Sequence, residues 1–206
     1  MDESIEALIE KARDGDGSAL AELFDQYRGR LRRMVQLRMD RRVQSRVAES
    51  DVLQEAFVDL ANQLPNYVKS PKLPFFLWLR LLTGQRLAKI HRMHLQQKKR
   101  SIVREVRFSD QIPEASSVLI AAEIAGQFTS AAGHAIREET RLKVQQVLER
   151  MSEHDREIIS LRSVEQLSNE EIALELGISN KAASMRYIRA IIRLKELLEE
   201  VPGILD

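Results

Sequence analysis

One short segment near the C-terminus constrains the fold more than any other part of the sequence. It opens with SNEE at residues 168–171, a capping box in which the serine and glutamate side chains satisfy backbone N–H groups that a helix start leaves free. Gly177 then favours the left-handed conformation that ends a helix, and Ser179 caps a second helix that runs to about Glu200. The pattern predicts two helices joined by a tight turn. Their small shared core consists of Ile172, Ala173, Leu176 and Ile178.

These two helices have the spacing of a helix-turn-helix, and their charges favour DNA binding. Residues 181–195 hold five basic residues and no acidic one, whereas residues 149–175 hold eight acidic residues and three arginines. Basic charge concentrated on one helix of an acidic domain suits contact with DNA phosphates, and the start of that helix would enter a major groove. The alternative is an ordinary helical hairpin with a solvated basic face. The pattern alone does not say which kind of regulator this is.

Apolar residues recur at helical spacing through the N-terminal half as well. After a short leading helix we expect a helix over residues 18–40, with Ser18 as its N-cap. Another helix begins near Ser50 and is stopped by Pro65, because proline lacks the N–H group that a helix interior needs.

Two further helices follow from start signals. One covers residues 74–97, since Pro74 suits the first turn of a helix. The other covers residues 137–151, and after it Ser152 caps the next helix with Asp155 placed to complete a capping box. No long alternating segment suggests a sheet.

We therefore expect an all-α protein with two small helical domains joined by a linker, the second domain containing the helix-turn-helix. The N-terminal domain covers residues 1–100 and the C-terminal domain residues 137–206. Residues 101–136 form the linker, because Ser, Ala and Gly become more frequent there, Pro113 appears and periodicity fades. One short helix is expected within it, around residues 118–128.

Composition excludes several classes of protein. With no cysteine the chain has neither disulfides nor thiolate metal sites. Its start, MDESIEALIEK, is acidic and amphipathic and does not resemble a secretion signal. The most apolar run, Phe75–Leu82, contains Arg80 and is far shorter than the ~20 residues that a bilayer crossing needs. We expect a cytoplasmic protein without membrane insertion.

Positive charge is unevenly divided along the chain. Residues 1–107 hold 21 Lys and Arg against 14 Asp and Glu, whereas residues 137–200 hold 11 against 13. The N-terminal half therefore carries the basic surface that a polyanion would require.

Two features of the N-terminal half require a joint explanation. The helix after Ser50 is expected to turn four side chains outward, Asp51, Gln54, Glu55 and Asp59. Such an acidic stripe suits docking to a basic protein surface but is also typical of a solvated face. The helix over residues 74–97 begins with aromatic residues and ends in basic ones. Such a helix can guide a nucleic-acid strand, although core packing explains most of its aromatic residues equally well.

Three segments resemble parts of the extracytoplasmic-function (ECF) RNA polymerase sigma factors. The polymerase-clamp-binding helix of that family resembles SDVLQEAFVDLANQL, and its minus-ten-binding helix is similar to PFFLWLRLLTGQRLAKIHR. The family's minus-thirty-five-binding domain resembles MSEHDREIISLRSVEQLSNEEIALELGISNKAASMRYIRAIIRLKELL. The resemblance covers about residues 5–100 and 137–198, in the family's order.

The resemblance implies a sigma factor that binds core RNA polymerase and promoter DNA, with no cofactor and no catalytic or metal site. The residues implied to bind core polymerase are Asp51, Gln54, Glu55 and Asp59. Those implied to bind the minus-ten element are Tyr67, Lys69, Lys72, Trp78, Gln85, Arg86, Lys89 and Arg92. Those implied to bind upstream duplex DNA are Asn180, Lys181, Ser184, Met185, Arg186 and Arg189.

The chain departs from the family pattern at two of these places. The loop over residues 66–74, matched to the loop that captures a flipped-out base, is about two residues longer than usual and contains Pro71 and Pro74. The recognition helix starts with Ala182-Ala183-Ser184 in place of a Gly-Thr-Val-type sequence. Neither the accepted base nor the promoter preference can therefore be carried over from the family.

Two rival hypotheses stay open on the sequence. A stand-alone helix-turn-helix regulator explains the C-terminal half. It does not explain why an acidic stripe occurs together with a helix whose basic residues could guide a nucleic-acid strand. An enzyme would need a metal or acid–base site, and the pair His91 and His94 lies on a basic helix without a nearby carboxylate. The sequence also leaves open whether an anti-sigma factor, phosphorylation, the linker or another regulator controls activity.

Overall fold

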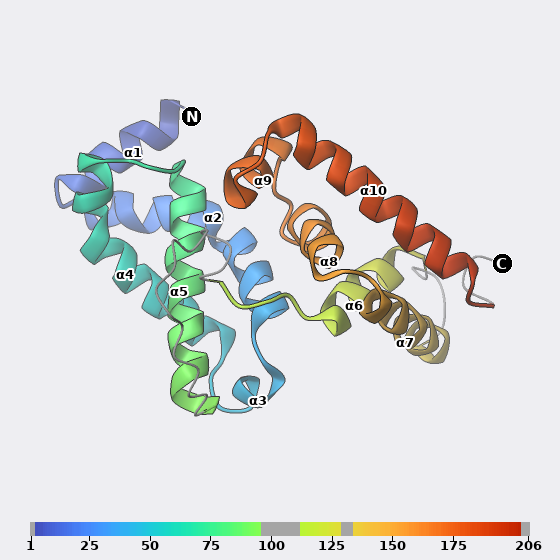
Figure 1. Cartoon of the computed structure of the whole chain (residues 1–206). Helices are drawn as coiled ribbons and strands as arrows, with labels where there is room; N and C mark the ends of the chain where they lie inside the picture. The colour runs from blue at the N-terminus through green and yellow to red at the C-terminus, as the bar shows by residue number, and fades with distance from the viewer. Residues whose placement is uncertain (1–2, 96–111, 129–133, 203–206) are drawn as a thin grey trace. The chain divides into compact units, whose positions relative to one another are not determined.

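The computed structural model describes residues 3–95, 112–128 and 134–202 of the chain (Figure 1). All regular structure in these ranges is helical, so the predicted all-α fold class is confirmed. The chain divides into two compact units, Met1–Pro113 and Glu114–Asp206. We call them unit 1 and unit 2.

In its described residues, 3–95 and 112–113, unit 1 contains five helices, three of them long. The helices are α1 (Glu3–Arg13), α2 (Gly17–Arg38), α3 (Arg41–Gln44), α4 (Glu49–Lys69) and α5 (Phe75–Leu95). Helices α2, α4 and α5 pack against one another in pairs, and α1 packs on α2 and α4 (Figure 1). Their facing sides bury leucines almost completely, among them Leu23, Leu60 and Leu77. Each such side chain contributes roughly 1.5–3 kcal/mol to folding.

Two helix boundaries in unit 1 differ from the predictions. The N-cap of α2 is Asp16 and not Ser18, because the Asp16 carboxylate accepts hydrogen bonds from the backbone N–H groups of residues 18 and 19. Pro65 does not stop α4, which continues to Lys69. The proline side chain is exposed, and the burial of Leu64 and Tyr67 on either side of it keeps the helix on the core.

Unit 1 also includes two residues that the sequence placed in the linker. Ile112 lies in a small core cluster with Met34 and Leu81, and it packs directly over Gly84. A Cβ atom at Gly84 would lie 2.5 Å from Ile112 Cγ1, so this position needs glycine. Arg38 Nη1 donates to the carbonyl oxygen of Pro113 at 2.7 Å. Residues 112 and 113 are therefore held against α2 and α5.

Unit 2 contains the remaining helices of the described chain. These are α6 (Ser117–Phe128), α7 (His134–Arg150), α8 (Glu153–Ile159), the π-helical turn η2 (Ser160–Val164), α9 (Asn169–Leu176) and α10 (Asn180–Glu199). The short helix predicted around residues 118–128 is confirmed by α6, which packs on α7. Most of the remaining predicted linker, residues 101–111 and 129–133, lies outside the described residues, and the assignment of residues 101–136 as a separate linker stays a prediction.

The predicted caps at Ser152, Ser168, Gly177 and Ser179 are confirmed, but the capping box predicted at Ser152 is not formed, because the Asp155 carboxylate accepts from the Ser152 hydroxyl and not from its backbone N–H. Ser152, Ser168 and Ser179 each accept a backbone N–H from the residue three positions later, at 3.1 Å. At the capping box, Glu171 accepts from the Ser168 N–H at 2.8 Å. Gly177 has φ +63°, the left-handed conformation that ends α9. The turn between α9 and α10 is therefore fixed on both sides by local chemistry.

The π-helical turn was not predicted. It extends α8 by five residues, and its end is marked by Gln166, a non-glycine residue with φ 59°. Among the described residues no helix is long and apolar enough to cross a membrane.

Candidate functional site

The predicted acidic stripe lies on α4, and its members do not all have the same surroundings. Asp51, Gln54 and Glu55 are exposed, whereas Asp59 is half-buried. Asp51 has a structural task as well, because its Oδ2 accepts the N–H of Ala48 at 3.0 Å and so satisfies the start of the helix. Gln54 is the member whose side chain makes no hydrogen bond with another described residue.

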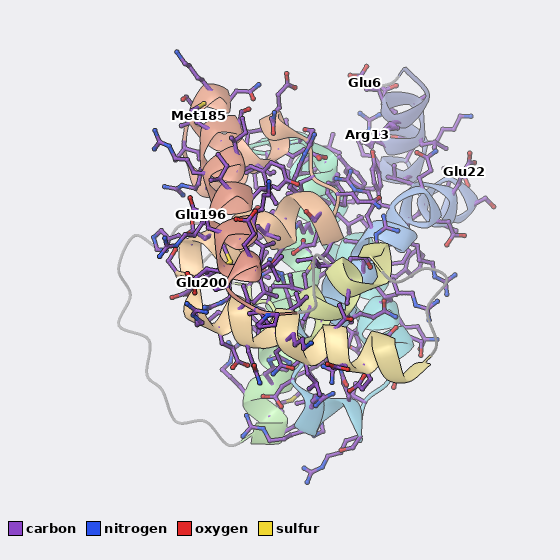
Figure 2. The ribbon with its side chains drawn as sticks, turned by 90° about the vertical axis from the view of Figure 1, so that its right-hand side faces the viewer. Glu6, Arg13, Glu22, Met185, Glu196 and Glu200 are labelled. Atoms are coloured by element: carbon purple, nitrogen blue, oxygen red, sulfur yellow. The ribbon has the colours of Figure 1, made fainter. Side chains whose placement is uncertain are left out.

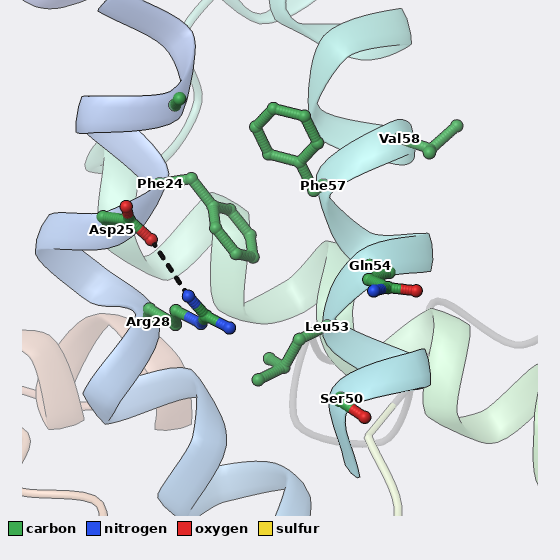
Figure 3. A pocket seen from close by; sticks show the side chains of 9 residues that line it. Phe24, Asp25, Arg28, Ser50, Leu53, Gln54, Phe57 and Val58 are labelled. Carbon is green, nitrogen blue, oxygen red and sulfur yellow. Dashed lines mark ion pairs between the residues drawn. The ribbon is translucent and has the colours of Figure 1, made fainter. Parts of the chain in front are cut away.

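An apolar pocket of about 420 Å³ lies beside this stripe, between α2 and α4 (Figure 3). Phe24 and Phe57 line it and contact each other edge-to-face, with ring centroids 5.3 Å apart. Asp25 and Arg28 form an ion pair of 3.5 Å at its α2 side, and Val58 is 53% exposed at its α4 side. The stripe residue Gln54 also lines the pocket. A polar stripe next to an apolar hollow is a typical arrangement for a protein-binding surface.

Two residues assigned to different predicted sites are bound to each other. Arg86 on α5 donates from Nε to Asp59 Oδ2 at 2.7 Å, and its Nη2 also contacts Asp59 Oδ1. A second ion pair joins Arg86 Nη1 to Glu55 Oε2 at 3.1 Å. The hydrogen bonds with Asp59 raise the pKa of the Arg86 guanidinium above its ordinary value. The charge of Arg86 is thus compensated inside unit 1, where it joins α4 to α5.

The loop between α4 and α5 is shorter than the sequence suggested, because α4 continues through residues 66–69 and leaves only Ser70–Pro74 as loop. The side chain of Tyr67 on α4 is bound to this loop. Its hydroxyl donates to the carbonyl oxygen of Leu73 at 2.9 Å, and its ring is stacked on Trp78 with centroids 4.3 Å apart. Burial raises the pKa of the Tyr67 hydroxyl, which is protonated at neutral pH and able to donate.

Tyr67, which the resemblance implies to bind the minus-ten element, is largely covered by neighbouring side chains. The side chain is only 8% exposed, and Phe75 contacts its ring edge-on at 5.7 Å in addition to the Trp78 stack. A cavity of about 220 Å³ nevertheless lies at the loop. It is lined by Gln63, Asn66, Tyr67, Ser70, Lys72, Leu73, Trp78 and Leu81. Amide, hydroxyl and ammonium groups therefore surround an aromatic floor.

The remaining residues predicted at the minus-ten element lie on exposed surface. Lys69 and Lys72 are exposed at the loop, and Gln85, Lys89 and Arg92 are exposed along α5. The basic residues 98–100, which follow this helix in the sequence, lie outside the described residues. Of these residues Lys72 lines the cavity, whereas Lys89 and Arg92 extend the basic surface along α5 away from the loop.

The first half of α10 presents the residues predicted to read upstream DNA. Asn180, Lys181 and Arg189 are exposed, Met185 is 42% exposed, and Ser184 and Arg186 are half-buried. Figure 2 shows Met185 near the start of the helix, with Glu196 and Glu200 near its end. In the described part of the chain Lys181, Arg186 and Arg189 form no ion pair, whereas the later Arg193 and Lys195 pair with Glu196 and Glu199. Within α10, positive charge without an acidic partner is thus confined to the first half of the helix.

The same helix carries an exposed apolar stripe that was not predicted from the sequence. Met185, Ile188 and Ile192 lie at helical spacing and are 42%, 46% and 52% exposed. The signal was present in the spacing of three and four residues, but we assigned no outward face to it. Tyr187 lies beside this stripe and its hydroxyl is 3.3 Å from Ser163 Oγ, which joins α10 to the end of η2.

Among residues 3–95, 112–128 and 134–202 no group of three or more His, Asp or Glu side chains is arranged to hold a metal ion. His91 is half-buried and accepts a hydrogen bond from the backbone N–H of Asp40, with Nε2 3.2 Å from the nitrogen. Burial lowers the pKa of His91, which favours the neutral imidazole that can accept this bond.

Comparison with known families agrees with this geometry. The sequence profile of the family described as ECF sigma factor matches residues 2–198, which is nearly the whole chain. The match covers both predicted surfaces of unit 1 and the helix-turn-helix of unit 2.

Individual relatives and one solved structure give the same picture. The chain is similar to the ECF RNA polymerase sigma factor ShbA of Streptomyces griseus, with 27% identity, 95% of this chain and 96% of the relative covered. It is also similar to the ECF RNA polymerase sigma factor SigD of Mycobacterium tuberculosis, with 26% identity, 94% of this chain and 84% of the relative covered. CnrH, solved in complex with the cytosolic domain of CnrY, has a similar helical fold, with a TM-score of 0.55, 21% identity and coverage of 96% of this chain and 99% of that one.

Proposed function

Because the chain belongs to the ECF sigma factor family, we propose that it brings RNA polymerase to its promoters by contacting DNA at two separate places. Members of this family are polymerase-associated factors for promoter-specific transcription initiation and not enzymes in their own right. In our proposal residues 1–100 bind core polymerase and the melted minus-ten strand, and residues 137–206 bind upstream duplex DNA. The chain would act where the polymerase and its DNA are, in the cytoplasm.

The proposed docking surface for core polymerase is the outer face of α4. Asp51, Gln54 and Glu55 would contact basic residues of the polymerase, and the apolar pocket between α2 and α4 would receive an apolar side chain. Asp59 would act indirectly, because it is bound to Arg86 and is half-buried. The juxtaposition of an acidic stripe and a pocket supports this assignment.

The proposed minus-ten surface is the Ser70–Pro74 loop with the exposed side of α5. Lys69 and Lys72 at the loop would contact phosphates of the melted strand, and the polar lining of the cavity together with Gln85 would contact an unpaired base. Lys89 and Arg92, toward the far end of α5, would contact phosphates where the minus-ten element borders duplex DNA. Flipping a base costs a few kcal/mol, which contacts of about 1–3 kcal/mol per base can offset. Tyr67 and Trp78 form the aromatic floor of the cavity, and Arg86 fixes α5 on α4.

The proposed upstream surface is the first half of α10. Lys181 and Arg189 would contact phosphates, and Asn180, Ser184 and Arg186 would contact base edges in the major groove. Met185 would supply an apolar contact of the kind that thymine methyl groups accept. The fixed turn at Gly177 sets the angle at which α10 enters the groove.

Each surface is small, so neither unit is expected to bind a promoter tightly by itself. Polymerase would hold both units on one piece of DNA, and binding of the second surface would then become intramolecular. The observation that supports the proposal most directly is the match of one family profile to residues 2–198, across both units.

Run-off transcription with core polymerase tests the proposal. The purified full-length chain is added to core polymerase on a library of genomic fragments, and the start sites are mapped. We expect initiation at a defined set of sites sharing two upstream elements. If the chain binds DNA fragments but never core polymerase, the stand-alone regulator hypothesis replaces this one.

Gln54→Arg is the cleanest single test of the docking surface, because Gln54 has no structural hydrogen bond to lose. An arginine there would oppose basic residues of the partner, and we expect affinity for core polymerase to fall about tenfold or more. Asn62→Arg, which adds the same charge to an exposed position two turns later on α4, is the matched control. Equal affinities of the two variants would remove the stripe from the interface.

A further inference from the structure

We infer that the turn between α2 and α4 forms a second phosphate-binding surface, in which Arg41 and Arg46 act with Lys89 and Arg92 of α5 on duplex DNA. This inference rests on the proposed function and adds a contact to it. The DNA bound there would be the duplex that borders the melted segment. None of the residues predicted to bind DNA lies in this turn.

The arginines of the turn are not needed for its folding. Its anchors are Met39 and Val43, which are 3% and 0% exposed, and the carboxylate of Asp40, which caps α3. Arg41 and Arg46 are exposed, and within the described part of the chain they form neither hydrogen bonds nor ion pairs with other side chains. Two charges are thus displayed to solvent without a structural role.

The acidic side chains near the turn are already engaged. Asp40 is bound to Arg42, with Oδ2 2.7 Å from Nη2, and this hydrogen bonding lowers the pKa of Asp40 to about 2. Glu49 accepts from Arg32 at 3.1 Å and from Gln36 at 2.7 Å. Because these carboxylates are paired with other residues, they do not neutralise Arg41 and Arg46. The turn keeps a net positive field toward solvent.

Helix α5 supplies the other half of the surface. Figure 1 shows α3 beside the end of α5, and the bond from the Asp40 N–H to His91 Nε2 at 3.2 Å ties the two elements together. Lys89 and Arg92, on either side of His91 in the sequence, are exposed and have no ion-pair partner among the described residues. His91 is therefore a positioning residue that holds two sets of cations at the same end of unit 1.

The position of this surface in unit 1 indicates which DNA it would contact. The Ser70–Pro74 loop joins one end of α4 to the start of α5, so the α3 turn lies at the opposite end of α5 (Figure 1). A helix of 21 residues is about 30 Å long, which is the axial length of roughly nine base pairs of B-form duplex. DNA held at the loop in its melted form is expected to be double-stranded again at that distance. Phosphate contacts on a duplex need only charge and position, which this surface supplies.

The test uses the double variant Arg41→Glu/Arg46→Glu in the complex with core polymerase, on a promoter found by run-off mapping. The salt dependence of promoter binding reports the number of phosphate contacts, at a slope of about 0.9 per contact. We expect the slope to fall by about two, and binding to weaken alike on promoters of different sequence. Lys11→Glu/Arg13→Glu is the matched control, because it reverses two exposed charges on α1. It should keep the wild-type slope.

Each result separates this inference from the proposed function. If the wild-type chain forms no promoter complex, the proposed function itself fails. If the wild type does so and both double variants keep its slope, the α3 surface binds no DNA. If Arg41→Glu/Arg46→Glu weakens binding to core polymerase without DNA, the surface contacts protein and the inference is wrong.

The role of His91 is tested with two substitutions. His91→Leu removes the acceptor for the Asp40 N–H, and we expect the salt slope to fall by about one because the turn is no longer held. His91→Gln keeps an acceptor, so it should restore most of the wild-type slope. If His91→Leu has the wild-type slope, His91 does not position this surface.

Discussion

Helices α5 and α10 are of nearly equal length, 21 and 20 residues, and each is the DNA-binding helix of its unit in our proposal, yet the protein uses them in opposite ways. Helix α5 is mostly core. Its first turns bury Phe75, Leu77 and even Arg80, which is 1% exposed. Helix α10 is mostly surface, and its buried side chains are concentrated in its second half, among them Leu194, Leu197 and Leu198.

The difference lies in where each helix obtains its DNA-binding groups. The proposed contacts of α10 are its own side chains, exposed over its first half and held by local caps. Helix α5 has few exposed groups, so its proposed surface also depends on neighbours, namely the Ser70–Pro74 loop, Tyr67 of α4 and, in our inference, the α3 turn. Substitutions on α5 should therefore mainly lower folding stability, and substitutions on α10 should mainly lower affinity for DNA.

The largest effect is expected for Arg86→Ala, which should reduce the folding stability of unit 1. A small effect would contradict the contrast drawn between α5 and α10. Asp59, only 19% exposed, would lose its counter-charge, because the variant removes both Arg86 contacts that join α5 to α4. We expect unit 1 to lose about 3 kcal/mol of folding free energy, the low end for breaking a buried ion pair. Denaturant unfolding followed by circular dichroism would measure this loss.

Arg186→Ala serves as the control in the same experiment. Arg186 forms no ion pair with another described residue, and removing it should change stability by less than about 0.5 kcal/mol. Recovery of stability in Arg86→Gln/Asp59→Asn would show that the loss comes from an uncompensated carboxylate. If Arg86→Ala and Arg186→Ala unfold alike, α5 is not held by this ion pair and the contrast between the helices is false.

For promoter binding we expect the α10 variant Arg186→Ala to have a clear effect, somewhat smaller in free energy than the effect of Arg86→Ala on folding. We expect Arg186→Ala to cost about 2 kcal/mol at the upstream element, which is roughly a thirtyfold loss of affinity, and to relax base preference at one position. Competition between promoter variants in the presence of core polymerase would measure both. Arg193→Ala is the matched control, because Arg193 lies two turns later and pairs with Glu196 at 3.5 Å. A promoter profile unchanged in Arg186→Ala would remove this arginine from base reading.

The same contrast explains which parts of the fold could be predicted from the sequence. The caps at Ser168, Gly177 and Ser179 are local chemistry, and the structure confirms all of them. The end of α4 was wrong because Pro65 argues locally for a stop, whereas the burial of Leu64 and Tyr67 against the rest of unit 1 keeps the helix intact. Tertiary packing outweighed local preference there.

The features of the candidate site also divide into those set by local sequence and those set by tertiary contacts. Exposure of Lys181 and Arg189 follows from the charge pattern of one helix, and the sequence predicted it. The pairing of Arg86 with Asp59 joins residues 27 positions apart, and the contact of Tyr67 with Leu73 depends on the true length of α4. No spacing rule within one helix contains either contact. The exposed Ile188 and Ile192 were visible as a pattern, but only the structure shows which face of α10 is covered.

Tyr67→Phe should have the smallest effect and sharpens the comparison most. The substitution keeps the ring on Trp78 and removes only the hydroxyl that donates to Leu73 at 2.9 Å. We expect a cost of about 1 kcal/mol, hence roughly fivefold weaker binding of a single-stranded minus-ten oligonucleotide by the polymerase complex. Tyr187→Phe removes a hydroxyl from α10 and should leave that binding unchanged. If wild type and Tyr67→Phe bind the oligonucleotide equally well, the hydrogen bond from Tyr67 to Leu73 is not needed for strand binding. The proposed surface on α5 would then not depend on this contact with its neighbour α4.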